Sequence, residues 1–158
     1  MAQKLRVGVI YGGRSGEHEV SLRSARSVIE ALDKDKYEVI PLGITRAGRW
    51  LAGATAKALL PPEAQKALPE DVEETASALA TLNPTGAGAA QLDVVIPALH
   101  GTYGEDGAIQ GMFEMAGVPY VAGFIAPNST LGLVEIDAVK SSKDDDEIGS
   151  RSGSAKRG

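Results

Sequence analysis

The sequence predicts an α/β fold in which helices cover both faces of a parallel β-sheet. Short apolar runs rich in β-branched residues recur at residues 5–11, 37–44 and 92–99, as is typical of strands that are buried on both faces. Amphipathic stretches with helical spacing lie between the runs. The resulting order of strand, helix, strand, strand, helix, strand implies parallel strands joined by right-handed crossovers.

The first predicted strand, residues 5–11, stops at a pair of glycines, and a helix follows it. Four apolar residues at positions i, i+3, i+4 and i+7 predict the face of this helix that packs on the sheet. They are Ala25, Val28, Ile29 and Leu32.

The start of this first helix is open between two N-cap candidates, Ser15 and Ser21. We favour Ser15, because Glu17 and Glu19 would then lie in the first turn, where the helix dipole favours negative charge. His18 is expected to be exposed to solvent.

The middle of the chain contains one clear strand and a long insertion. Residues 37–44 form the second strand, and residues 45–51 suggest a turn with a short extension. Residues 52–91 are rich in Ala, Pro and Glu with weak periodicity, so we treat them as an elaboration of the fold. Residues 92–99 form the third strand, which ends at His100.

A second helix is predicted over residues 108–116, with apolar positions Ile109, Met112, Phe113 and Ala116. Asp106 is a candidate N-cap, and Gly117 is suited to end the helix. Residues 118–121 form a fourth strand. The whole arrangement is a Rossmann-like sheet.

Two loop segments follow the carboxyl ends of predicted parallel strands, residues 12–19 and 100–107. Ligands of open α/β sheets bind at this edge. The glycine-rich first loop lacks the G-x-G-x-x-G spacing, an acid that could hold a ribose, and a G-K-[ST] sequence, so a dinucleotide site and a P-loop are both disfavoured. A glycine turn here could also be no more than a tight turn.

The composition of the chain disfavours several kinds of partner and rules out sites that need cysteine. The chain has 158 residues and a formal net charge of -5, which argues against a nucleic-acid partner bound through a basic surface. It has no cysteine, which suits a reducing cytoplasm and removes thiol chemistry. We expect no signal peptide and no membrane span, because no apolar run approaches about 20 residues.

Two long motifs in these loops carry a family resemblance. Gly-Gly-Arg-Ser-Gly-Glu-His-Glu-Val-Ser at 12–21 and Leu-His-Gly-Thr-Tyr-Gly-Glu-Asp-Gly at 99–107 resemble the signatures of D-alanine–D-alanine ligases. Ile-Gln-Gly at 109–111 and Gly-Val-Pro-Tyr-Val at 117–121 extend the match. The resemblance covers residues 4 to 123.

The resemblance implies the N-terminal domain that precedes an ATP-grasp unit. Such ligases join two D-alanines with ATP and magnesium through an acyl phosphate, for peptidoglycan synthesis and cell wall biogenesis. The family binds ATP and magnesium in its later domains, so this chain is expected to hold no cofactor and to be inactive alone. D-alanine and a second copy in a homodimer are the implied partners, and the cytoplasm is the implied location.

The resemblance also implies the site residues. It places Glu17 near the ammonium of the first D-alanine, as the catalytic and substrate-binding acid, with Val20, Ser21 and His100 as further substrate-binding residues. Without it, Glu17 could be a surface charge that complements the helix dipole, and His100 could merely hydrogen-bond the loop backbone. The acids at 105–106 are assigned no catalysis or metal.

The family pattern breaks down after residue 123. We therefore assign residues 1–123 to the family domain, leave residues 124–139 unassigned, and predict that residues 140–158 form a disordered tail, because they carry almost no apolar residues. Two alternatives stay open. One is a non-enzymatic binding or dimerisation module, and the other is an unrelated nucleotide- or flavin-binding α/β domain.

Overall fold

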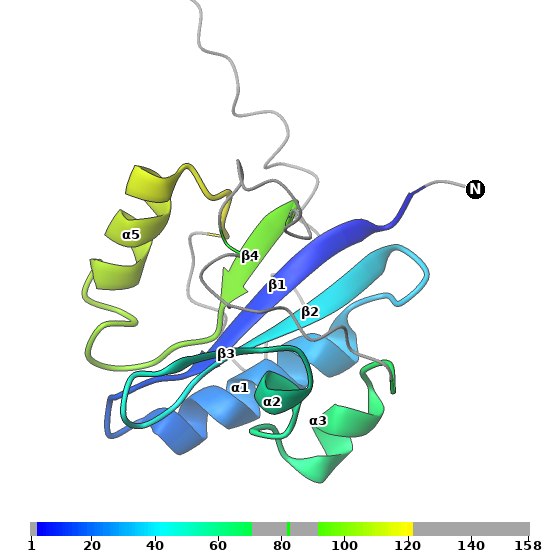
Figure 1. Ribbon diagram of the computed structural model, residues 1–158, viewed down its shortest axis with the longest axis horizontal. Helices are drawn as coiled ribbons and strands as arrows, with labels where there is room; N and C mark the ends of the chain where they lie inside the picture. The colour runs from blue at the N-terminus through cyan, green and yellow to red at the C-terminus, as the bar shows by residue number, and fades with distance from the viewer. Residues whose placement is uncertain (1–2, 71–81, 83–91, 122–158) are drawn as a thin grey trace, which may run out of the picture.

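The computed structural model describes residues 3–70, 82 and 92–121. Within these residues a sheet runs in the order β3-β2-β1-β4. The central strand β1 (Leu5–Gly12) is parallel to β2 (Tyr37–Ile44) on one side and to β4 (Val94–Pro97) on the other. Figure 1 shows helices on both faces of this sheet, so the predicted fold class is confirmed.

The sheet is mixed rather than wholly parallel, which corrects one prediction. After β2 the chain reverses through a tight turn in which the Thr45 amide donates to the Arg49 carbonyl. The extension beyond it, β3 (Trp50–Ala52), therefore pairs antiparallel with β2. A connection this short can only join antiparallel neighbours.

The predicted fourth strand is reduced to one bridge between Val95 and Tyr120. The Val95 amide donates to the Pro119 carbonyl, and the Val121 amide donates to the Val95 carbonyl. Pro119 has no amide hydrogen with which to continue a ladder, which accounts for the short pairing.

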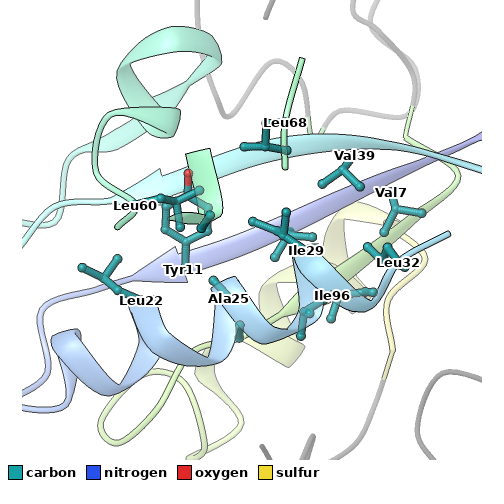
Figure 2. Packing of buried hydrophobic residues seen from close by; sticks show 14 of the residues in the cluster. Val7, Tyr11, Leu22, Ala25, Ile29, Leu32, Val39, Leu60, Leu68 and Ile96 are labelled. Carbon is teal, nitrogen blue, oxygen red and sulfur yellow. The ribbon is translucent and has the colours of Figure 1, made fainter. Parts of the chain in front are cut away.

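The two faces of the sheet carry separate cores. Val7, Val9 and Tyr11 of β1 face α1 (His18–Ala31), and Figure 2 shows Ala25 and Ile29 of that helix lying over the strands. The same core includes Ala64 of α3 (Pro62–Lys66), with Leu60 and Leu68 on either side of that helix. Ala56 of α2 (Gly53–Lys57) is also buried, and its carbonyl accepts a hydrogen bond from the Tyr11 hydroxyl. All four residues of the predicted α1 stripe are buried.

The opposite face carries Ile10, Leu42 and Val95, which pack with α5 (Ala108–Ala116). Ile109 and Phe113 of α5 are buried as predicted, whereas Ala116 is exposed. Gly117 ends the helix in the left-handed conformation at φ 64°, as predicted. Residues 71–81, 83–91, 124–139 and 140–158 lie outside the described residues, and so do the predictions made for them.

Candidate functional site

The two motif loops meet at the carboxyl edge of the sheet. One joins β1 to α1 and the other joins β4 to α5. The Ser15 hydroxyl of the first loop donates to the carbonyl of His100 in the second, at 2.7 Å. Adjacent parallel strands bring their following loops together, so the topology places both motifs in one site.

A buried hydroxyl and a glycine shape the β1–α1 loop. Gly12 has φ +91°, and a Cβ there would lie 2.2 Å from the carbonyl oxygen of Ile44, so only glycine fits. The Gly12 amide donates to Ser21 Oγ at 2.7 Å, and Ser21 Oγ donates to the Ala98 carbonyl at 2.6 Å. Ser21 is fully buried and ties the ends of β1 and β4 together.

His18 is buried, which contradicts the predicted exposure. Its Nδ1 lies 2.8 Å from the carbonyl oxygen of Gly13. Its position one turn before Ser21 and Leu22, both buried, places it on the face of α1 that packs on the sheet.

The helix also begins later than predicted, at His18 rather than directly after Ser15. Ser15 still serves this end of α1, because its Oγ accepts the Glu17 amide hydrogen at 3.1 Å. Ser21, the other candidate cap, lies inside the helix.

Two exposed carboxylates hold the backbone of the β4–α5 loop. Glu105 accepts the Gly101 amide hydrogen at 3.0 Å and lies 3.3 Å from His100 Nδ1. These contacts, the first of them foremost, hold the pKa of Glu105 below its usual range. The carboxylate is therefore ionised near neutral pH and can only accept hydrogen bonds.

Asp106 is the second of these carboxylates. It accepts the amide hydrogens of Tyr103 at 2.9 Å and of Ala108 at 3.1 Å, and these bonds lower its pKa. The N-cap of α5 is Gly107, so the prediction of Asp106 at that position is wrong by one residue. The Asp106 side chain nevertheless binds the amide of Ala108 in the first turn. Tyr103 has a left-handed backbone at φ 70°, which its bond to Asp106 helps to hold.

His100 is held on both ring nitrogens by side chains. Its Nε2 lies 2.7 Å from Ser24 Oγ on α1, while its Nδ1 faces Glu105. The alternative in which the His100 ring merely hydrogen-bonds the loop backbone is therefore wrong, because both of its partners are side chains, Glu105 and Ser24.

Glu17 lies where the two loops touch. Its carboxylate packs on Gly101, at which a Cβ would lie 2.5 Å from Oε2 of Glu17. Glu17 itself is exposed, and Val20 is half-buried on the same helix. Glu19 points elsewhere and pairs with Arg46 at 2.7 Å. The structure therefore brings Glu17 beside the His100 loop and places Glu19 in a surface ion pair.

A cavity of about 300 Å³ opens beside the two loops. Its wall includes His100 and a set of residues that the sequence did not single out for the site: Arg14, Trp50, Leu99, Tyr103 and Met112. The Arg14 guanidinium lies 6.0 Å from the centre of the Tyr103 ring, within reach of a cation–π contact. Glu17, Val20 and Ser21 are not part of this wall. In the sequence, the only indication that Arg14 and Tyr103 belong to the site is that each lies inside one of the two motifs.

Comparison with known proteins identifies the family. The family model described as "D-ala D-ala ligase N-terminus" matches residues 6–123. The chain belongs to the D-Ala–D-Ala ligase family. This assignment decides against an unrelated nucleotide- or flavin-binding domain.

Individual relatives agree with the assignment. The D-alanine–D-alanine ligase of Corynebacterium aurimucosum is 46% identical over 143 residues, which cover 84% of this chain and 38% of the relative. That of Rhodococcus jostii is 49% identical over 132 residues, covering 75% of this chain and 35% of the relative. The chain thus spans little more than a third of the length of these relatives.

The structural comparison points to the same family. The crystal structure of the VanG D-Ala:D-Ser ligase of Enterococcus faecalis matches with a TM-score of 0.57 at 36% identity, covering 75% of this chain and 36% of that one. The match lies in the N-terminal part of the ligase fold. The family is one of ligases, and this chain corresponds to its N-terminal domain.

Two further findings concern the part of the chain that the structure describes. No group of three or more His, Cys, Asp or Glu side chains is placed to hold a metal ion there. In the same residues, no helix has the length and apolar character needed to cross a bilayer.

Proposed function

We propose that this domain supplies part of the site for the first D-alanine of a ligase reaction, with Glu17 as the group that binds the substrate ammonium. The observation that carries the proposal is the placement of the Glu17 carboxylate at the junction of the two motif loops, against Gly101. D-Ala is the substrate that the names of the relatives in both comparisons share. A carboxylate that meets an ammonium forms a charge-assisted hydrogen bond, which contributes about 1.5–3 kcal/mol.

The other proposed site residues support Glu17 in different ways. Ser21 acts through the backbone, because its hydroxyl is engaged by Gly12 and Ala98. His100 holds the second loop, since both of its nitrogens face protein groups. Val20, half-buried on the helix that carries Glu17, contributes apolar surface.

The complete reaction that we propose is ATP-dependent and ADP-forming, joins two D-alanines in the cytoplasm, and serves peptidoglycan synthesis. The resemblance to the family also supports a homodimer. The family resemblance assigns ATP and magnesium to the later domains, and among the described residues no group of three or more His, Cys, Asp or Glu side chains is placed to hold a metal ion. We therefore infer that the ATP-grasp domains of the family supply those sites.

A chimera tests the role of Glu17. Residues 1–121 would replace the matching segment of a homologous ligase, and the KM for the first D-alanine would be measured. Glu17→Gln should raise this KM about tenfold or more, in line with the loss of a charge-assisted contact. Glu19→Gln is the matched control, because Glu19 is in the same turn but pairs with Arg46. An unchanged KM in Glu17→Gln would remove Glu17 from the site.

The 158-residue chain alone is expected to lack ligase activity. The measurement is ADP release in the presence of ATP, magnesium and D-alanine. Turnover that rises in proportion to the protein, above a control without protein, would contradict this expectation.

A further inference from the structure

A continuous path of contacts leads from the middle of α1 to the Glu17 carboxylate. Ser24 Oγ lies 2.7 Å from His100 Nε2, and His100 Nδ1 lies 3.3 Å from Glu105 Oε1. The other oxygen of Glu105 accepts the Gly101 amide hydrogen at 3.0 Å. Gly101 in turn packs on Glu17. Ser24 lies seven residues after Glu17, two turns along the same face of the helix.

The chemistry of this path fixes the direction of each hydrogen bond. An ionised carboxylate only accepts, so the contact with Glu105 requires a proton on His100 Nδ1. A neutral imidazole carries one proton, so Nε2 must then accept. Among the described residues, the Ser24 hydroxyl is the only hydrogen-bond partner of Nε2. This hydroxyl must therefore donate.

We propose that Ser24 is a positioning residue, which fixes the tautomer and orientation of His100 and through it holds Gly101 against Glu17. The inference rests on the proposed role of Glu17 as the ammonium-binding group. Ser24 is buried, so loss of the imidazole contact would leave its hydroxyl poorly satisfied. A second tether, from Ser15 Oγ to the His100 carbonyl, holds the backbone of the same residue.

The serine, histidine and glutamate share the order of a hydrolase triad, but a nucleophilic role does not fit. Ser24 is buried and is not part of the cavity wall. A nucleophile must be open to its substrate. The arrangement instead fits a serine that orients the histidine ring without contacting the substrate.

The sequence makes this inference directly testable, because it contains only two histidines. A ¹⁵N–¹H long-range spectrum of the 158-residue chain would show two imidazole rings, and His100→Gln would assign them. The spectrum would be recorded at about pH 8.5, because alkaline pH favours the neutral form of an imidazole. We expect His100 to carry its proton on Nδ1 and to show an unprotonated Nε2. A wild-type ring protonated on Nε2 would overturn the proposal.

Ser24→Ala should move the His100 Nε2 resonance toward the protonated position and shift the Gly101 amide and the Glu17 side-chain carboxyl resonance. Ser27→Ala is the matched control, because that hydroxyl is exposed and donates only to the Arg23 carbonyl one turn back. An unchanged His100 ring in Ser24→Ala would overturn the proposal. A changed ring without any shift at Gly101 and Glu17 would overturn the positioning of Glu17.

Glu105→Ala keeps the test open if Ser24→Ala does not fold, because Glu105 is exposed. Loss of its carboxylate should weaken the preference for a proton on Nδ1, and retention of the wild-type ring signals would contradict the path. None of these samples contains D-alanine, so the measurements do not depend on substrate binding. Failure of the positioning role is thus separated from failure of the proposed function, which the KM of the chimera tests.

Discussion

In the β1–α1 loop the hydrogen bonds that set the backbone involve buried side chains, Ser21 and His18, whereas in the β4–α5 loop they come from the exposed carboxylates Glu105 and Asp106. A buried group that loses its partner costs about 1–3 kcal/mol. An exposed carboxylate can exchange its protein partner for water at little cost. The first loop is therefore built into the fold, whereas the Glu105 and Asp106 bonds of the second loop are easier to exchange for water.

This difference places Glu17 at a boundary. Its own backbone belongs to the first loop, while its carboxylate packs on Gly101 of the second loop, whose amide is bound by the exposed carboxylate of Glu105. The surroundings of Glu17 therefore depend on both kinds of hydrogen bond. The predictions below test the contrast, starting with the largest expected effect.

Gly12→Ala should be the most damaging single change in the two loops. A Cβ there adds a collision with the Ile44 carbonyl to an unfavourable φ of +91°, so we expect a loss of more than about 3 kcal/mol in the free energy of unfolding. Gly107→Ala is the control in the other loop, with φ +87° and open space around the added carbon. It should lose only about 1–2 kcal/mol. Equal losses in urea unfolding would refute the contrast between the loops.

Ser21→Ala should come next. It leaves the Gly12 amide and the Ala98 carbonyl buried without their shared partner, and we expect a loss of about 1–3 kcal/mol in the free energy of unfolding. Ser27→Ala on the exposed face of the same helix should change it by less than about 0.5 kcal/mol. A Ser21 variant as stable as the Ser27 variant would show that the hydroxyl does not tie the strands.

The core of the fold could be predicted because periodicity reports it directly. The apolar stripe of α1 and the two-sided burial of β1 follow from residue spacing alone. The error at His18 arose because a polar side chain at a helix start is usually exposed, and only the packing of α1 on the sheet shows otherwise. The direction of β3 depended on a turn whose length the sequence left open.

The site could be predicted as two loops but not as a network. Strand order alone brings residues 12–19 and 100–107 to one edge. The hydrogen-bond partners of Ser24, His100 and Glu105 depend on side-chain rotamers and on the distance between α1 and the β4–α5 loop. Residue spacing in the sequence predicts neither of these. Arg14 and Tyr103 lie inside the two motifs, but only the packing of the loops shows that their side chains line the cavity.

Acid should loosen the β4–α5 loop before the β1–α1 loop. The pKa of Asp106 is lowered in the folded protein by the amides of Tyr103 and Ala108. Its contribution to stability is therefore complete above the unfolded pKa and is lost as the pH falls through the folded pKa. Tyr103 and Ala108 amide resonances should titrate with a midpoint below the ordinary value of 3.8, while the Gly12 amide should not follow that titration. Asp106→Asn should abolish the response, and a midpoint at or above the ordinary value would contradict the bonding.

Glu17→Gln should have the smallest effect on folding despite its expected effect on KM. Glu17 precedes α1 as its N-cap residue, but its side chain makes no capping hydrogen bond and is exposed. We expect the free energy of unfolding to change by less than about 0.5 kcal/mol at physiological salt. If the carboxylate instead serves the helix dipole, its removal should cost about 0.3–1 kcal/mol, with the cost rising at low ionic strength. Glu19→Gln, in the first turn of the same helix, removes both a charge near the dipole and the ion pair with Arg46, so it gives an upper bound for the dipole effect. A loss for Glu17→Gln that grows as salt is removed would assign the carboxylate to the helix, whereas a salt-independent and negligible change leaves it available for the substrate.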